Sequence, residues 1–222
     1  MVTNSFVICM LGQRIGHRLS KTDKKTKDRI ELKGTTNMVP NSNSNTFQAL
    51  SDTEVFVLES NYNLWLEHGP GHGPPTRRQQ VDKNVQAFQA LSDTEVLVLD
   101  IDGPLNLWLE HGPFGQVPPP RQQVDKNVLA FQALSGTEVL VLDSDGKLWL
   151  EHRPFGQVPP PRQQVDGKVL AFQALSDTEV LVLDYGGNLW LEHGPFGQVP
   201  PPRQHVDGNV SLTPLPTQSE LP

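Results

Sequence analysis

The feature that most constrains this chain is a unit of about 41 residues that occurs four times in succession after residue 45. Each unit opens with a Phe-Gln-Ala-Leu segment, starting at Phe47, Phe88, Phe131 and Phe172. Each also contains a Leu-Trp-Leu-Glu-His segment, with tryptophans at Trp65, Trp108, Trp149 and Trp190. A repeat of this length buries its apolar surface only against its neighbours, so we expect the units to fold as one array.

Each unit is predicted to form four short strands. In the third unit, apolar runs at 138–142 and 147–151 flank an Asp-Gly step, which is a strong hairpin signal. Residues 169–175 have the composition of another strand. Residues 162–166 follow three prolines, which indicates a strand at the edge of a sheet. Four strands in about 41 residues are typical of a β-propeller blade.

The strands present apolar side chains on both faces. Residues 96–99 and 107–109 are apolar or aromatic throughout, whereas a sheet with one solvated face alternates. Sheets covered on both sides suit blades stacked around an axis. We therefore expect an all-β fold, a propeller of four four-stranded blades. A β-trefoil or another solenoid is the alternative, although a trefoil needs three units and this chain has four.

The ends of the array suggest how a ring could close. The first unit starts at Phe47 with no Arg-Gln-Gln-Val-Asp segment before it, and such a segment follows the last unit at 203–207. We expect this C-terminal strand to complete the first blade, because closure removes open sheet edges. Nearly identical blades could instead be shared between two chains, so a monomer and a blade-sharing homodimer both remain open.

Composition divides the chain into three parts. Residues 1–45 carry a charge of about +5 and are predicted to form a disordered arm, with an organelle transit peptide as the alternative. Residues 46–212 contain the propeller, and residues 213–222 are predicted to be a flexible tail. The repeats carry about −12, giving −7 in total, which argues against a nucleic-acid-binding surface.

The cysteine and hydropathy content exclude several other classes. Cys9 is the single cysteine, so neither a disulfide scaffold nor a cysteine-based zinc site is possible within the chain. No apolar run approaches the ~18 residues of a membrane span. These features, together with the absence of a recognisable signal peptide, favour a cytoplasmic protein. We expect no cofactor.

One segment of the repeat resembles a known family. The hairpin at 142–149, Leu-Asp-Ser-Asp-Gly-Lys-Leu-Trp, is similar to blades of the tectonin- and tachylectin-type lectin propellers. The resemblance covers all four repeats, about residues 47–210, and departs from the pattern at 59–63 and 184–187. It implies a multivalent, lectin-like protein that binds glycans or glycoproteins through repeated shallow sites.

The candidate ligand-binding residues are those that recur. Phenylalanines in turn-rich loops are expected to be exposed platforms for a sugar ring, and the Glu-His pairs at strand ends offer partners for hydroxyl groups. The tryptophans are either ligand contacts or core residues. The candidates are Phe114, Phe155, Phe196, Glu110, His111, Glu151, His152, Glu192, His193, Trp108, Trp149 and Trp190. The first unit has no loop phenylalanine, so three sites are expected.

The repeat also bears on two functions other than glycan binding. A propeller can serve as a protein-interaction scaffold with no glycan site, which is the alternative function. Catalysis is not expected, because an active site needs different residues in different roles and a copied unit supplies the same ones. A metal site is not expected either, since the adjacent Glu and His of one strand point to opposite faces.

Overall fold

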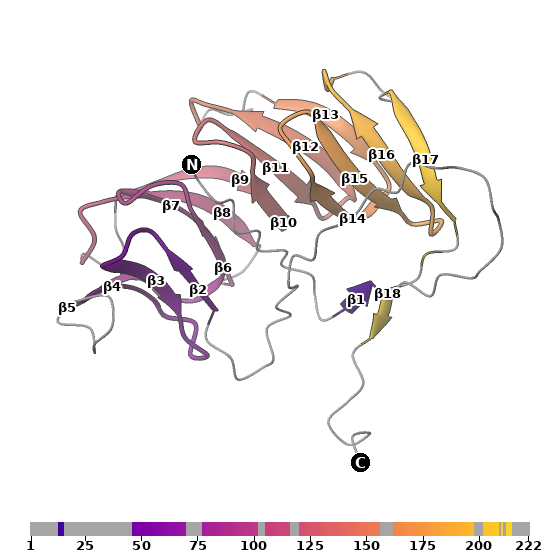
Figure 1. Cartoon of the computed structure of the whole chain (residues 1–222). Helices are drawn as coiled ribbons and strands as arrows, with labels where there is room; N and C mark the ends of the chain where they lie inside the picture. Colours follow the sequence, from indigo (N-terminus) through magenta and orange to yellow (C-terminus); the bar gives the residue numbers. More distant parts are fainter. Residues whose placement is uncertain are drawn as a thin grey trace, which may run out of the picture.

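The computed structural model describes residues 13–15, 46–69, 77–101, 105–115, 120–155, 162–197, 202–208, 210 and 212–214. Within these ranges the regular structure consists of β-strands, β1 to β18, and contains no helix (Figure 1). The described residues accordingly include no helix of the length and apolarity that crossing a membrane would require.

Each repeat forms one antiparallel sheet whose four strands pair in sequence order. The first sheet contains β2 (Thr46–Ala49), β3 (Glu54–Leu58), β4 (Leu64–His68) and β5 (Arg77–Asp82). The second contains β6 (Val85–Ala90), β7 (Glu95–Asp100), β8 (Asn106–His111) and β9 (Arg121–Lys126). The third contains β10 (Val128–Ala133), β11 (Glu138–Asp143), β12 (Lys147–His152) and β13 (Arg162–Gly167). The fourth contains β14 (Val169–Ala174), β15 (Glu179–Asp184), β16 (Leu189–His193) and β17 (Arg203–Asp207).

The four sheets are blades of a β-propeller, as the repeat predicts. They follow one another along an arc, with the first blade at one end and the fourth at the other (Figure 1). Between neighbouring blades lies an apolar core, and the described residues form three such clusters. Each blade has a forward face, which packs on the next blade, and a rear face, which packs on the preceding one. Between the third and fourth blades, Leu140, Leu148 and Val165 form the forward face and Phe172 and Val182 the rear face.

The outer faces of the array lack this cover. Phe47 on the rear face of the first blade is 60% exposed, whereas its counterpart Phe88 is 1% exposed. Val206 on the forward face of the fourth blade is 51% exposed, whereas its counterpart Val165 is fully buried. The described blades therefore form an open array rather than a closed ring.

The expected route to closure is wrong. The C-terminal strand β17 pairs with β16 and completes the fourth blade, not the first. The first blade has its own outer strand, β5, which pairs with β4. The prediction fails because the Arg-Gln-Gln-Val-Asp strand is the last strand of its blade and follows the other three in sequence. Among the described residues, every strand of the four repeats then belongs to the blade of its own unit.

Parts of the arm and tail meet in a separate small sheet. Strand β1 (Gln13–Ile15) pairs antiparallel with β18 (Leu212–Pro214). The other predictions for the arm and the tail lie outside the described residues, and the propeller's first strand begins at Thr46.

The turn between β11 and β12 favours a glycine. Gly146 has a φ of +74°, and its amide donates to the Asp143 carbonyl at 3.0 Å. A β-carbon at this position would lie 2.8 Å from the Tyr185 hydroxyl oxygen of the next blade. The sequence-predicted hairpin is thus present, and its glycine adopts the left-handed backbone conformation without strain.

We predict that Gly146→Ala lowers the free energy of unfolding by at least about 1 kcal/mol, because an L-residue is strained at this φ. Gly136→Ala is the matched control, since a β-carbon there meets no atom within 4 Å. That variant should be neutral or slightly stabilising. Urea denaturation of both variants measures the difference, and equal stabilities would contradict the assigned turn.

Candidate functional site

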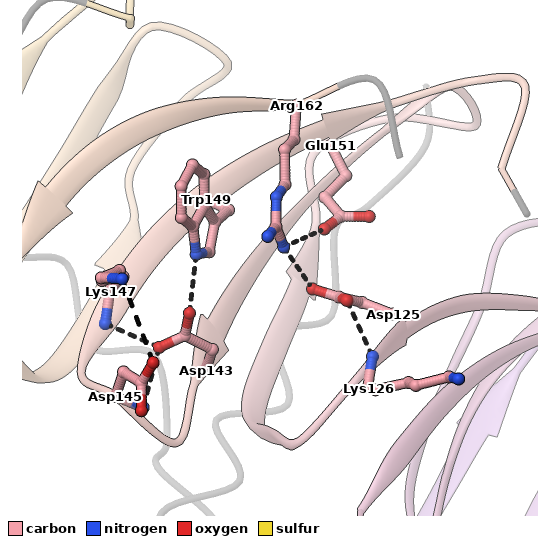
Figure 2. Close-up of polar contacts among 8 residues, drawn as sticks. All are labelled: Asp125, Lys126, Asp143, Asp145, Lys147, Trp149, Glu151 and Arg162. Carbon is pink, nitrogen blue, oxygen red and sulfur yellow. Dashed lines mark hydrogen bonds and ion pairs between the residues drawn. The ribbon is translucent and has the colours of Figure 1, made fainter. Parts of the chain in front are cut away.

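The hairpin that carries the lectin resemblance is organised by one aspartate. Asp143 Oδ1 accepts hydrogen bonds from the backbone amides of Asp145 and Lys147, both at 2.9 Å (Figure 2). Its Oδ2 accepts a hydrogen bond from Trp149 Nε1 at 2.8 Å. A single carboxylate therefore fixes both the turn and the orientation of the indole ring.

The same tryptophan contact occurs in the other three blades. The indole nitrogens donate to carboxylates at 2.7 to 3.0 Å in the pairs Trp65–Glu59, Trp108–Asp100 and Trp190–Asp184. In the first unit, Glu59 stands at the position of this aspartate and accepts the same hydrogen bond from the tryptophan. The departures from the lectin-like pattern in the first and fourth units leave this contact intact, so the acidic residue has a structural role in every blade.

An arginine covers one face of each tryptophan ring. The guanidinium carbon of Arg162 lies 4.1 Å from the Trp149 ring centroid. Equivalent stacks at 4.1 to 4.2 Å join Arg78 to Trp65, Arg121 to Trp108 and Arg203 to Trp190. The cation–π contact holds the arginine over a face of the indole ring, where a pyranose would otherwise stack. The tryptophans are partly buried, which agrees with a packing role and leaves little free aromatic face.

The same arginines join neighbouring blades. Arg162 Nη1 lies 3.0 Å from Asp125 Oδ2 of the preceding blade and 3.6 Å from Glu151 Oε1 of its own (Figure 2). Arg121 contacts Asp82 and Arg203 contacts Asp166 across the other two interfaces, both at 3.4 Å. The recurring cluster of tryptophan, arginine and two carboxyl groups therefore lies at the junctions between blades.

The predicted glutamates Glu110, Glu151 and Glu192 are fully buried at these junctions. Within the described residues, no donor makes a hydrogen bond of ordinary geometry to their carboxyl oxygens. Burial raises the pKa of Glu110 to about 10 and those of Glu151 and Glu192 to about 9, and the adjacent aspartate of the preceding blade acts in the same direction. These glutamates are consequently neutral at pH 7 and are not available to sugar hydroxyls.

The loop phenylalanines are also buried, contrary to the exposure expected from the sequence. Phe114, Phe155 and Phe196 are 8%, 2% and 8% exposed. Each ring packs into the core between its own blade and the preceding one, and Phe114 meets Phe56 edge to face at 5.6 Å. Each of the three described junctions contains one of these rings. Turn-rich sequence indicated a loop correctly but could not show that the loop folds inward.

The predicted histidines lie apart from the glutamates that precede them in sequence. His111, His152 and His193 are partly exposed, and each Nδ1 lies 3.2 to 3.5 Å from a glutamate on the neighbouring strand of the same blade, namely Glu95, Glu138 and Glu179. His68 makes the same contact with Glu54 at 2.9 Å. The described residues contain no group of three or more side chains placed to hold a metal ion.

Two recurring contacts were missed in the sequence. Gln89 Oε1 accepts from the Ala133 amide at 2.8 Å and Gln89 Nε2 donates to the Ala133 carbonyl at 3.4 Å. Gln48 binds Ala90 in the same way. The second recurring contact is made by the arginine of the Arg-Gln-Gln-Val-Asp strand, which pairs with an aspartate of the preceding blade. Both residue types recur at the repeat spacing, which was the signal that could have identified them as contacts between blades.

The geometry gives the recurring residues a common purpose. The loop phenylalanines and the stacked arginines hold one blade on the next, the glutamates are buried at the same junctions, and the histidines brace a hairpin within one blade. The groups predicted to bind glycans are therefore already engaged in intramolecular contacts. The large apolar surface that remains exposed includes Phe47 at one end of the array and Leu170, Leu175 and Val206 at the other.

Comparison with known proteins adds a limited likeness. No protein-family model and no curated protein sequence matches the chain. Among solved structures, the N-terminal domain of Nup159 is similar with a TM-score of 0.49 and 13% identity over 68% of this chain and 45% of that one. Human WBSCR16 gives a TM-score of 0.43 and 13% identity, covering 68% and 49%. Prp20p from Saccharomyces cerevisiae gives 0.40 and 13%, covering 72% and 50%.

This chain therefore spans about half the length of the solved structures it resembles. These comparisons do not confirm the resemblance to tectonin- and tachylectin-type lectins.

We predict that Phe155→Ala destabilises the protein by about 3–5 kcal/mol, because it leaves a cavity in the core between the second and third blades. Tyr185→Ser is the control. It replaces a ring that is 58% exposed with the residue found at the corresponding position of the third unit, and should cost under about 0.5 kcal/mol. Thermal denaturation compares the two variants. A small effect of Phe155→Ala would indicate that the phenylalanine lies on the surface.

We also predict that the protein becomes less stable as the pH rises from 5.5 to 8. In this range the buried glutamates hold protons that the unfolded chain, with pKa values near 4.5, has released. The triple variant Glu110→Gln, Glu151→Gln, Glu192→Gln should be more stable than wild type at pH 8 and less dependent on pH. Glu67→Gln is the control, because Glu67 is partly exposed and paired with Arg78. A melting temperature that rises with pH in wild type would contradict the assignment.

Proposed function

We propose that this chain is a non-catalytic protein-binding module that engages partners through the uncovered faces of its first and fourth blades. The observation that supports it most is the exposure of apolar side chains on blade faces that are buried everywhere else in the array. Clustered exposed apolar groups on a soluble fold are characteristic of interaction surfaces. Exposed apolar sheet faces match protein surfaces better than the hydroxyl-rich surface of a glycan.

The chemistry of the repeat supports the same function. A lectin site needs an accessible aromatic face and free hydrogen-bonding groups, whereas the aromatic rings predicted to bind a sugar are either buried, as the loop phenylalanines are, or stacked under arginine, as the tryptophans are. The candidate carboxyl groups are buried and neutral at pH 7. Protein binding through the end faces needs none of these groups to leave its place in the structure.

The proposal is tested by comparing protein capture with glycan binding. Tagged wild-type chain should retain protein partners, including co-expressed untagged copies of itself, and should give no glycan-array signal that free monosaccharide removes. The double variant Phe47→Asp, Val206→Asp should lose that protein binding because each change places a charge on an end face. Tyr62→Asp is the control, since Tyr62 is 49% exposed and lies in a turn outside both faces.

Two results would overturn the proposal. One is specific, competable glycan binding that survives in the double variant. The other is protein capture that is equal for wild type and the double variant, since the end faces would then have no part in it.

A further inference from the structure

The two ends of the array carry the counterparts of the two sides of each internal junction. On the forward face of the fourth blade, Val206 is 51% exposed and Leu175 is 39% exposed. In the third blade their counterparts, Val165 and Leu134, pack into the core shared with the next blade. On the rear face of the first blade, Phe47 is 60% exposed, while the same position in later blades is buried. Each end therefore exposes the residues whose counterparts pack together at the internal junctions.

The polar contacts of the interface show the same division. Between successive blades, a glutamine binds the backbone of an alanine one repeat later, as Gln48 does with Ala90 and Gln132 with Ala174. The next glutamine in this series is Gln173, at the forward end. The alanine that no preceding blade reaches is Ala49, which is exposed at the rear end.

The charged contact completes the pattern. At each junction an aspartate of one blade meets an arginine of the next, as in the pair Asp125–Arg162 at 3.0 Å. The last aspartate of the series, Asp207, is exposed at the forward end. The first arginine, Arg78, has no preceding blade and pairs with Glu59 and Glu67 of its own blade.

We propose that the partner of these faces is a second copy of the chain, bound head to tail so that the fourth blade of one packs on the first blade of the other. This inference rests on the proposed function and names the partner of the same surfaces. The new junction repeats the existing ones, with Val206 and Phe47 in its apolar core, Gln173 on the backbone of Ala49, and Asp207 beside Arg78.

Two copies are the number that closes a ring. The ends of one arc lie apart, so one chain does not cover its own faces (Figure 1). Two chains supply eight blades, the upper end of the usual range of about four to eight, and three chains would exceed it. The contact is heterologous, and such contacts form a closed ring when the rotation between copies permits it. Two identical junctions then leave neither face exposed.

The test uses single-face variants of the full chain. Light scattering should give twice the chain mass for wild type and the chain mass for Val206→Asp and for Phe47→Asp. An equimolar mixture of the two variants should regain dimers, because each supplies the face that the other has lost. Both positions are exposed within one chain, so circular dichroism of each variant should match that of wild type; Tyr62→Asp should remain dimeric.

Three outcomes would overturn the proposal. Wild type at the chain mass would show that the faces do not meet each other. Dimers of Phe47→Asp alone would show a contact between two forward faces instead. A mixture that stays at the chain mass would exclude the head-to-tail arrangement. If wild type is a monomer whose capture of a different protein depends on Val206 and Phe47, self-assembly is refuted while the proposed function stands.

Discussion

The structure depends on the packing of one two-sided apolar sheet against the next. Every described blade carries leucines on its forward face and valines with phenylalanine on its rear face, so no blade can satisfy its own surface. Burial of such surface is the main favourable term in folding. A chain of such blades remains stable only where each has neighbours. The interior blades meet this condition, and the two terminal ones meet it on one side.

Around this apolar contact lies a polar frame that fixes its geometry. The glutamine–backbone bonds join the first strands of adjacent blades, and the arginine–aspartate pairs join their outer strands. Apolar packing alone tolerates sliding, whereas directional bonds at two separated places restrain both rotation and translation. Tryptophan supports the outer restraint, because its ring holds the arginine in place and its nitrogen is bound to the hairpin carboxylate.

Much of the fold could be predicted because the repeat is explicit. Period, strand number and the apolar character of both faces led to four blades. The residue at which each blade begins could not be predicted, since a series of nearly identical units has no marked beginning. The predicted place of β17 in the first blade is wrong for this reason. The candidate site fared less well. Recurrence identified Glu151 and Phe155 as important, but a residue recurs equally whether it serves a ligand or a junction. Only burial separates these roles, and burial depends on contacts with the neighbouring blade.

One position breaks the sameness of the units. Arg153 stands where the second and fourth units have Gly112 and Gly194, and its Nη2 lies 2.8 Å from Glu95 Oε2 of the second blade. Nearly identical blades can exchange places during folding, because an incorrect blade would pack against its neighbour almost as well as the correct one. An additional ion pair at one junction alone gives that junction an identity. This ion pair distinguishes the junction between the second and third blades from the other, nearly identical junctions.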